Sequence, residues 1–138
     1  MIRYLSADDI RDFHEAAIER YGGVMGEHEP GLIELMAEKP MQVVFGQEAY
    51  PGLFMKAAVY WEGFAARQFF ADGNKRTAYA TAAMFLCRNG HRFVVSNMEL
   101  YDISMAVANG HMTLEELAAW IESHVETIGG PEQFLNEP

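Results

Sequence analysis

Apolar residues recur at intervals of three and four along most of the chain, which is the spacing of amphipathic helices. Ser6 followed by Asp9 approximates a capping box at the start of the first helix, and Gly22-Gly23 ends this helix. Met41 to Phe45 is instead a short, partly β-branched run closed by Gly46, which predicts a strand or a small hairpin. Further helices are expected at Pro30 to Glu38, Pro51 to Arg67, Gly73 to Asn89, Ser96 to Asn109 and Thr113 to Val125. The pattern predicts an all-α bundle of about six helices with one small β element.

The helix that begins at Gly73-Asn74 is apolar on nearly every side, so we expect it to be the central, buried helix of the bundle. Cys87 lies in its apolar run and is expected to be a small buried side chain. No repeat or long linker divides the chain. Residues 1–128 are therefore expected to form a single domain, and 129–138 a loose tail.

The charge of the protein limits its partners. The 138 residues carry a formal net charge of −10, whereas general nucleic-acid binding needs a basic face, so no nucleic-acid partner is expected. The N-terminus lacks the apolar core of a signal peptide, and the uncharged run from Thr77 to Cys87 is too short for a bilayer, which needs ~20 residues. We therefore expect a cytoplasmic protein without a membrane partner. The one cysteine excludes an internal disulfide, and the histidines show no spacing typical of a metal site.

The sequence Asp72-Gly73-Asn74-Lys75-Arg76 has the layout of a phosphate site. Free N–H groups and the helix dipole at the start of a helix favour an anion, and Gly73 allows the backbone to approach it closely. Lys75 and Arg76 add positive charge, and the Asp72 carboxylate could hold Mg²⁺ on a nucleotide. The alternative is a helix cap followed by a solvated first turn. Two cations in a first turn oppose the helix dipole, however, and this favours a ligand.

These residues resemble the signature of the Fic/Doc family, His-x-Phe-x-(Asp/Glu)-Gly-Asn-(Gly/Lys)-Arg. Phe70 and residues 72–76 match it at the right spacing. Further stretches similar to the family are FHEAAIERYGG (13–23), PGLIELMAEKP (30–40), YPGLFMKAA (50–58) and FLCRNGHRF (85–93), so the resemblance covers about residues 4 to 126. Lys75, Thr77-Ala78 and the small size place the chain nearer the Doc (death-on-curing) branch than the longer Fic adenylyltransferases. Tyr79 stands where those enzymes carry a second arginine.

The resemblance implies a Fic fold and assigns roles to the residues of the signature. Gly73 and Asn74 would cradle the phosphates of ATP, Lys75 and Arg76 would contact them, and Asp72 would ligate Mg²⁺. Asp72 and Arg76 would thereby take part in catalysis. Phe70 would anchor the loop in the core. The β-hairpin flap, Gln42, Val43, Val44 and Phe45, would pair with the backbone of a target protein by strand addition.

The chain departs from the signature at its first residue, because Gln68 occupies the position of the family histidine. In the family this histidine removes a proton from the hydroxyl of the target. A glutamine amide is a poor base, and a positioned general base is worth about 10²- to 10⁴-fold in rate. Phosphoryl transfer depends mainly on positioning and charge neutralisation, so weakened activity is the expected result.

Three hypotheses follow from these residues. The first is a Doc-like toxin of a toxin–antitoxin pair, which transfers phosphate (or AMP) from Mg-ATP to a hydroxyl of a target such as elongation factor Tu, with activity weakened by Gln68. The second is a catalytically silent relative that binds a nucleotide or a protein partner without transfer. The third is a helical interaction domain with a vestigial phosphate site, and the intact run from Asp72 to Arg76 argues against it. The self-inhibitory motif of some Fic proteins, (Ser/Thr)-x-x-x-Glu-(Gly/Asn), is absent, so the resemblance implies a separate antitoxin.

Overall fold

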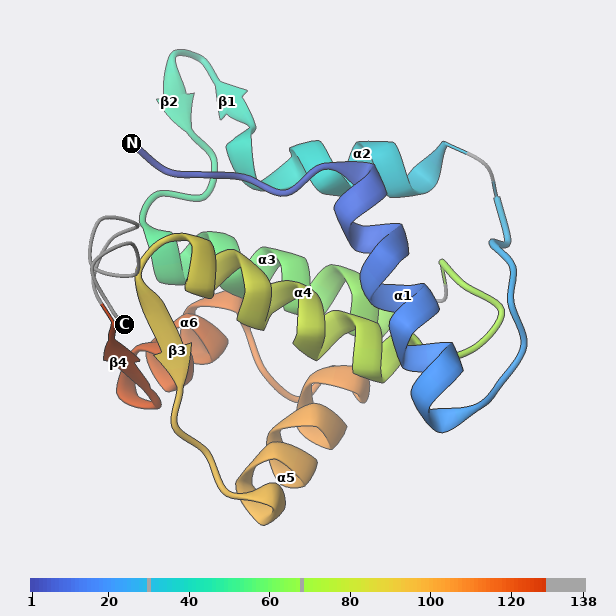
Figure 1. The fold of residues 1–138 in the computed structure, drawn as a ribbon. Coiled ribbons are helices and arrows are strands. Elements are labelled where there is room, and N and C mark those ends of the chain that lie inside the picture. The colour runs from blue at the N-terminus through green and yellow to red at the C-terminus, as the bar shows by residue number, and fades with distance from the viewer. Residues whose placement is uncertain (30, 68, 129–138) are drawn as a thin grey trace, which may run out of the picture.

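A computed structural model describes residues 1–29, 31–67 and 69–128, and these residues form the helical bundle of Figure 1. The predicted all-α fold with a small hairpin is confirmed. Pro30, Gln68 and the tail 129–138 lie outside the described residues. The helices are α1 (Ala7–Tyr21), α2 (Leu32–Glu38), a 3₁₀ turn η1 (Lys39–Met41), α3 (Leu53–Ala66), α4 (Asn74–Arg88), α5 (Asn97–Ala108) and α6 (Leu114–Ser123).

Three helices begin with the capping boxes that their sequences indicate. The side chain of Ser6 accepts a hydrogen bond from the Asp9 backbone, and the Asp9 side chain accepts one from the Ser6 backbone. α5 has the same arrangement at Ser96 and α6 has it at Thr113. Pro51, in contrast, was wrongly expected at the first position of α3. It precedes the N-cap Gly52, and the helix begins at Leu53.

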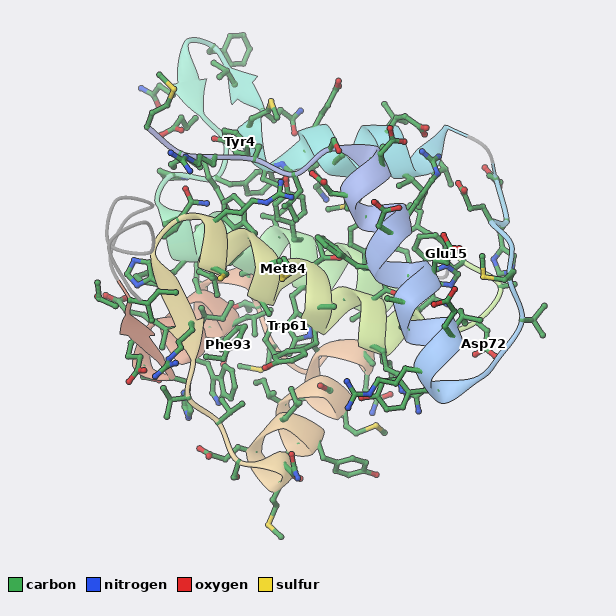
Figure 2. All side chains as sticks on the ribbon, in the orientation of Figure 1. Tyr4, Glu15, Trp61, Asp72, Met84 and Phe93 are labelled. Atoms are coloured by element: carbon green, nitrogen blue, oxygen red, sulfur yellow. The ribbon has the colours of Figure 1, made fainter. Side chains whose placement is uncertain are left out.

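The central helix is α3 and not α4, which corrects the expectation from the sequence. α3 packs against α4, α5, α6 and η1, and its side chains are buried without a break from Lys56 to Trp61. α4 buries one face, whereas Met84 and Cys87 are exposed on the other. Figure 2 shows Trp61 among the packed helices, and its ring meets the aromatic rings of Tyr79, Phe93 and Trp120 edge to face.

The predicted hairpin is made by β1 (Val43–Val44) and β2 (Gln47–Glu48), which are antiparallel and extend away from the helices in Figure 1. We call residues 42–48 the flap. Both residues of its turn have positive φ, 50° at Phe45 and 78° at Gly46, as in the type I′ turns that suit the twist of two strands. Phenylalanine is an unusual residue at such a φ, and its side chain is fully exposed.

A second antiparallel pair joins β3 (His91–Phe93) to β4 (Val125–Thr127), in addition to the one small β element that the sequence predicts. Val125 was assigned to the last helix, but α6 ends at Ser123 and the chain turns back at once to pair with Phe93. No helix in the described part of the chain is long and apolar enough to cross a membrane.

Candidate functional site

The segment between α3 and α4, residues 69–73, is anchored by Phe70. This side chain is 1% exposed, and its ring stacks on the buried imidazole of His14 with centroids 3.8 Å apart and planes 8° from parallel. Phe64 of α3 lies behind the Phe70 ring. An aromatic ring held on both sides fixes the position at which α4 starts.

The side chain of Asn74 closes this segment into a loop. Its Oδ1 accepts a hydrogen bond from the backbone N–H of Phe70 at 3.1 Å, and its Nδ2 donates to the Phe70 carbonyl oxygen at 2.9 Å. Both groups of the amide are therefore used within the loop. Asn74 can offer a ligand its backbone N–H and the second N–H of its side-chain amide.

A short backbone ladder holds the loop from the other side. Glu27 and Phe70 form an antiparallel bridge, flanked by hydrogen bonds from His28 N–H to the Phe69 carbonyl and from Ala71 N–H to the Gly26 carbonyl, each 2.9 Å. The Glu27 carboxylate accepts two bonds from the guanidinium of Arg11 in α1, at 2.9 and 3.1 Å.

Arg11 also forms a 2.7 Å ion pair with Glu34 in α2. The hydrogen bonds to these two carboxylates raise the pKa of Arg11 above its ordinary value, and the bond to Glu27 contributes more than the bond to Glu34. One arginine thus joins α1, the 26–28 segment and α2.

Asp72 connects the loop to the end of α1, beside which it lies in Figure 2. Its carbonyl oxygen accepts a 2.8 Å hydrogen bond from Nε2 of His14, so this nitrogen carries a proton. Its carboxylate accepts from the N–H of Gly73 at 2.8 Å and from that of Val24 at 3.3 Å. A Cβ atom at Gly23 would lie 2.6 Å from Asp72 Oδ2, so only glycine at this position allows the two segments to come so close.

The N-terminus of α4 has the features of an anion site. Its N-cap Gly73 has φ 75° and has no side chain to accept a hydrogen bond from the helix. The N-cap residues of α1, α5 and α6 each accept such a bond. Lys75 and Arg76 are exposed, and among the described residues neither forms an ion pair. The Arg76 guanidinium lies 4.4 Å from the centre of the Tyr21 ring, and Lys75 Nζ lies 3.7 Å from Sδ of Met105. Uncapped N–H groups and two unpaired cations favour a phosphate at this position.

The same residues fit Mg²⁺ through one ligand. No three His, Cys, Asp or Glu side chains gather into a metal cluster in the described part of the chain. Mg²⁺ on a nucleotide needs only one or two carboxylates, because phosphates and waters complete its shell. Each oxygen of the exposed Asp72 carboxylate accepts one backbone donor and keeps a lone pair for a ligand.

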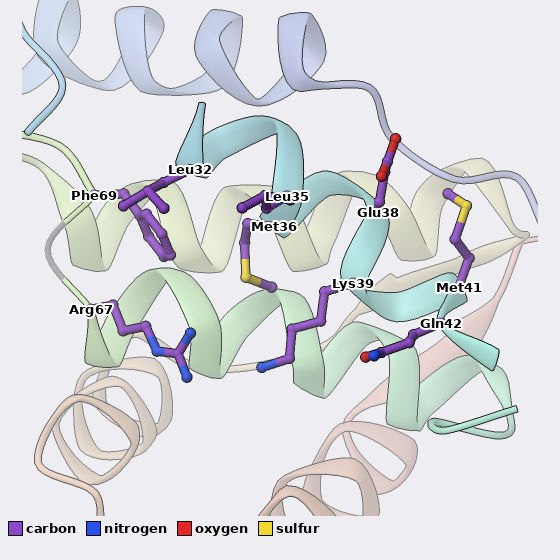
Figure 3. A pocket seen from close by; sticks show the side chains of 9 residues that line it. All are labelled: Leu32, Leu35, Met36, Glu38, Lys39, Met41, Gln42, Arg67 and Phe69. Carbon is purple, nitrogen blue, oxygen red and sulfur yellow. The ribbon is translucent and has the colours of Figure 1, made fainter. Parts of the chain in front are cut away.

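A pocket of about 470 Å³ is lined by residues of α2 and η1 and by residues that follow α3, and it extends from the base of the flap to the start of the loop (Figure 3). Arg67 and Phe69, the sequence neighbours of Gln68, lie at one end, and Met41 and Gln42 at the base of the flap lie at the other. The position of Gln68 itself lies outside the described residues. The other lining residues are Leu32, Leu35, Met36, Glu38 and Lys39. The flap residues Val43, Val44 and Phe45 are exposed beyond this pocket.

The sequence motif places the proposed phosphate-binding residues together. It does not indicate the two side chains of α1, His14 and Arg11, that hold the loop. His14 was regarded as an ordinary histidine without a metal partner, and Arg11 was not considered. A signal for His14 existed, because it falls on the apolar face of α1 with Ile10 and Ile18. A histidine at such a position needs a hydrogen-bond partner in the core.

Comparisons with known proteins identify the family of the chain. The model of the Fic/DOC family matches residues 4–86. "Protein kinase doc" of Escherichia phage P1 is 34% identical over 117 residues, which cover 85% of this chain and 91% of the phage protein. "Toxin Doc" of Mycolicibacterium smegmatis is 34% identical over 123 residues, covering 86% of this chain and 91% of the relative. The chain belongs to the Fic/DOC family, as its signature predicted.

Proposed function

We propose that this protein is a Doc-type toxin that transfers phosphate from Mg-ATP to a hydroxyl of a target protein. The observation that supports this most directly is the N-terminus of α4, where no described residue supplies a side-chain cap or an ion-pair partner for Lys75 and Arg76. The name of one relative, a protein kinase, suggests phosphate as the transferred group rather than AMP, and the name of the other, a toxin, supports the role of a toxin.

In this proposal the backbone N–H groups of Asn74 and Lys75 bind phosphate oxygens at the positive end of the helix dipole. Lys75 contributes a mobile point charge, while Arg76 contributes a planar, forked donor that Tyr21 holds in place. Asp72 holds Mg²⁺, which neutralises charge on the phosphates. His14 keeps Asp72 in position through its carbonyl oxygen. The loop is therefore arranged before the nucleotide arrives.

Transfer forms a bond between the acceptor oxygen and the γ-phosphorus while the bond from that phosphorus to the ADP oxygen breaks. The hydroxyl proton has to leave, and the amide of Gln68 is a poor acceptor for it. The proton then passes to solvent without a positioned base, at a cost of about 10²- to 10⁴-fold in rate. Positioning and charge neutralisation remain available from the other residues, so we expect slow transfer.

The flap is the proposed docking edge for the target, which by resemblance to Doc is elongation factor Tu. Its strands are two residues each and exposed, and an extended segment adding to either edge would supply the missing backbone hydrogen bonds. The pocket of Figure 3 connects this edge with the residues on either side of Gln68. By the same resemblance a separate antitoxin is the proposed restraint on activity.

Gln68 also supports a second candidate function, a silent relative that binds a nucleotide or a protein without transfer. Both candidates need the phosphate site.

Calorimetry with Mg-ATP tests the phosphate site on the wild type, on Arg76→Ala and on Arg92→Ala. The last variant is a control that removes an exposed arginine from β3. We expect Arg76→Ala to weaken binding about tenfold or more, since it removes a charged phosphate contact, and Arg92→Ala to leave it unchanged. Equal heats for all three proteins would contradict the phosphate site.

A further inference from the structure

Lys56 in α3 is a charged residue whose side chain is fully buried. Its side chain is 0% exposed and is among the largest fully buried side chains of the protein. Burying an ammonium group is costly, and replacing a buried ion pair by well-packed apolar groups is often neutral or stabilising. Stability alone therefore gives no reason for a lysine at this position of α3.

The ammonium group has two partners, and both belong to the chain that leaves the flap. Nζ donates to Oε1 of Glu48 in β2 at 3.0 Å and to the carbonyl oxygen of Tyr50. The Glu48 side chain is 53% exposed, so this contact reaches from the core of the bundle to the edge of the hairpin. The lysine stem thus spans the distance between α3 and the flap.

Apart from the two bonds of Lys56, few contacts in the described part of the chain orient the flap. Its ladder consists of two residue pairs, Val43 with Glu48 and Val44 with Gln47, and all four residues are exposed. An isolated two-stranded hairpin is at best marginally stable in water. The backbone bond from Ala49 N–H to the Gln42 carbonyl closes the hairpin base, and a 3.1 Å bond from Gln42 N–H to the Lys39 carbonyl ties this base to η1.

We propose that Lys56 is the positioning residue of the flap. Two attachment points, one in β2 and one just after it, fix both the place and the direction in which the hairpin leaves the core. Val43 lies opposite Glu48, so the direction of β1 follows from that of β2. Lys56 thereby determines how the docking edge is presented to a target, a consequence that rests on the proposed function.

The contact can be removed without disturbing the rest of the core. Lys56→Met keeps the length and burial of the stem and removes the charge, while Glu48 and the Tyr50 carbonyl can turn to water. Glu48→Ala removes the exposed partner and leaves the core side chain in place. Lys39→Met is the matched control, because it deletes a neighbouring lysine that lies 5.9 Å from the Tyr50 ring and makes no bond to Glu48.

Amide hydrogen exchange tests the inference without any target, with the Ala49 amide reporting on the flap and the Ala82 amide in α4 on the whole fold. We expect Ala49 to exchange about tenfold faster in Lys56→Met, as for the loss of one charge-assisted hydrogen bond, with Ala82 unchanged. Glu48→Ala should also speed Ala49 exchange, and should add nothing in the Lys56→Met background. Unchanged Ala49 exchange in both single variants, or effects of the two that simply add, would overturn the proposal. If Lys56→Met does not fold, the exchange rate of the Ala49 amide in Glu48→Ala is compared with that in Lys39→Met. Faster exchange in Glu48→Ala alone supports the proposal, and equal rates overturn it.

Capture of the protein on immobilised elongation factor Tu then tests the consequence for docking. Lys56→Met should weaken capture and leave the heat of Mg-ATP binding unchanged, because α4 is not involved in the contact. A wild type that is not captured would contradict the proposed target, and the exchange measurement would still decide the role of Lys56.

Discussion

Nε2 of His14 donates a 2.8 Å hydrogen bond to the carbonyl oxygen of Asp72, while the same imidazole stacks on Phe70. One buried side chain of α1 thus contacts two residues of the loop that precedes α4. The bond fixes the peptide that leads into Gly73, whose N–H group faces the Asp72 carboxylate. The geometry of the proposed phosphate site is therefore set partly from a helix that contributes no residue of the signature.

Two substitutions separate the roles of His14. His14→Phe keeps a stacked ring but removes the donor, which should weaken Mg-ATP binding about tenfold, close to the loss of one hydrogen bond. His14→Gln supplies an amide donor without the ring and should retain more of the affinity. Calorimetry measures both variants, and thermal unfolding reports their stability. Equal affinities for the wild type and His14→Phe would show that the bond does not position the site.

Gln68→His tests whether the site lacks only its base. The imidazole can accept the hydroxyl proton, so transfer should rise by about 10²-fold or more. Gln68→Ala is the control, since it removes the amide without adding a base and should stay at the parent rate. With Mg²⁺ and elongation factor Tu, γ-labelled ATP reports phosphate transfer and α-labelled ATP reports AMP transfer. We expect the γ label.

If Gln68→His folds, binds ATP and labels nothing above the parent, Gln68 is not the missing base. The silent relative would then be the better description of the protein.

Proline in the flap tests docking by strand addition. Proline at Val43 or Val44 removes one backbone N–H donor. We expect weaker capture from the variant whose lost N–H faces the target strand. The bundle should stay folded, because both residues are exposed and outside the core. Capture on elongation factor Tu and circular dichroism measure the two effects. Unchanged capture by both folded variants would exclude the flap as the docking edge.

Asp9 should make the fold sensitive to acid. The hydrogen bond from Arg88, followed by that from the Ser6 backbone, lowers the pKa of Asp9 from 3.8 to about 2. A carboxyl with a depressed pKa in the folded state stabilises the protein above its unfolded pKa of 3.8, and this stability is lost as pH falls towards 2. The 2.8 Å pair with Arg88 joins α1 to the end of α4 and is partly exposed, so we expect an effect on the order of 1 kcal/mol after screening.

Urea unfolding of the wild type and of Asp9→Asn measures this effect. The two should differ at pH 7 and converge as the pH falls to about 2 and below, because the wild-type carboxyl then becomes protonated and uncharged, like the amide of the variant. Asp8→Asn is the control in the same helical turn, since the Asp8 side chain is 95% exposed. A difference between the wild type and Asp9→Asn that persists unchanged at low pH would contradict the linkage.

The accuracy of the sequence-based predictions followed the range of the interactions involved. Capping boxes such as Ser6 with Asp9 involve neighbours in the chain, so the helix starts that depend on them were predicted. The Asp72 to Arg76 motif was found for the same reason. The partners of that motif, His14 and Val24, come from distant segments, and no local pattern indicates which residues they meet. The central position of α3 was missed because hydrophobicity alone does not distinguish a helix surrounded by others from one that is covered on a single face.

The contact between His14 and Asp72 spans 58 positions, and this separation has a consequence for synthesis. The N-terminal part of a chain leaves the ribosome first, so α1 emerges while the loop and α4 have not yet been translated. Closing so long a segment costs entropy, which the helices and the loop recover only when they pack together. The proposed phosphate site therefore forms only after more than half of the chain has been made, and we expect a nascent chain that ends before α4 to lack nucleotide binding.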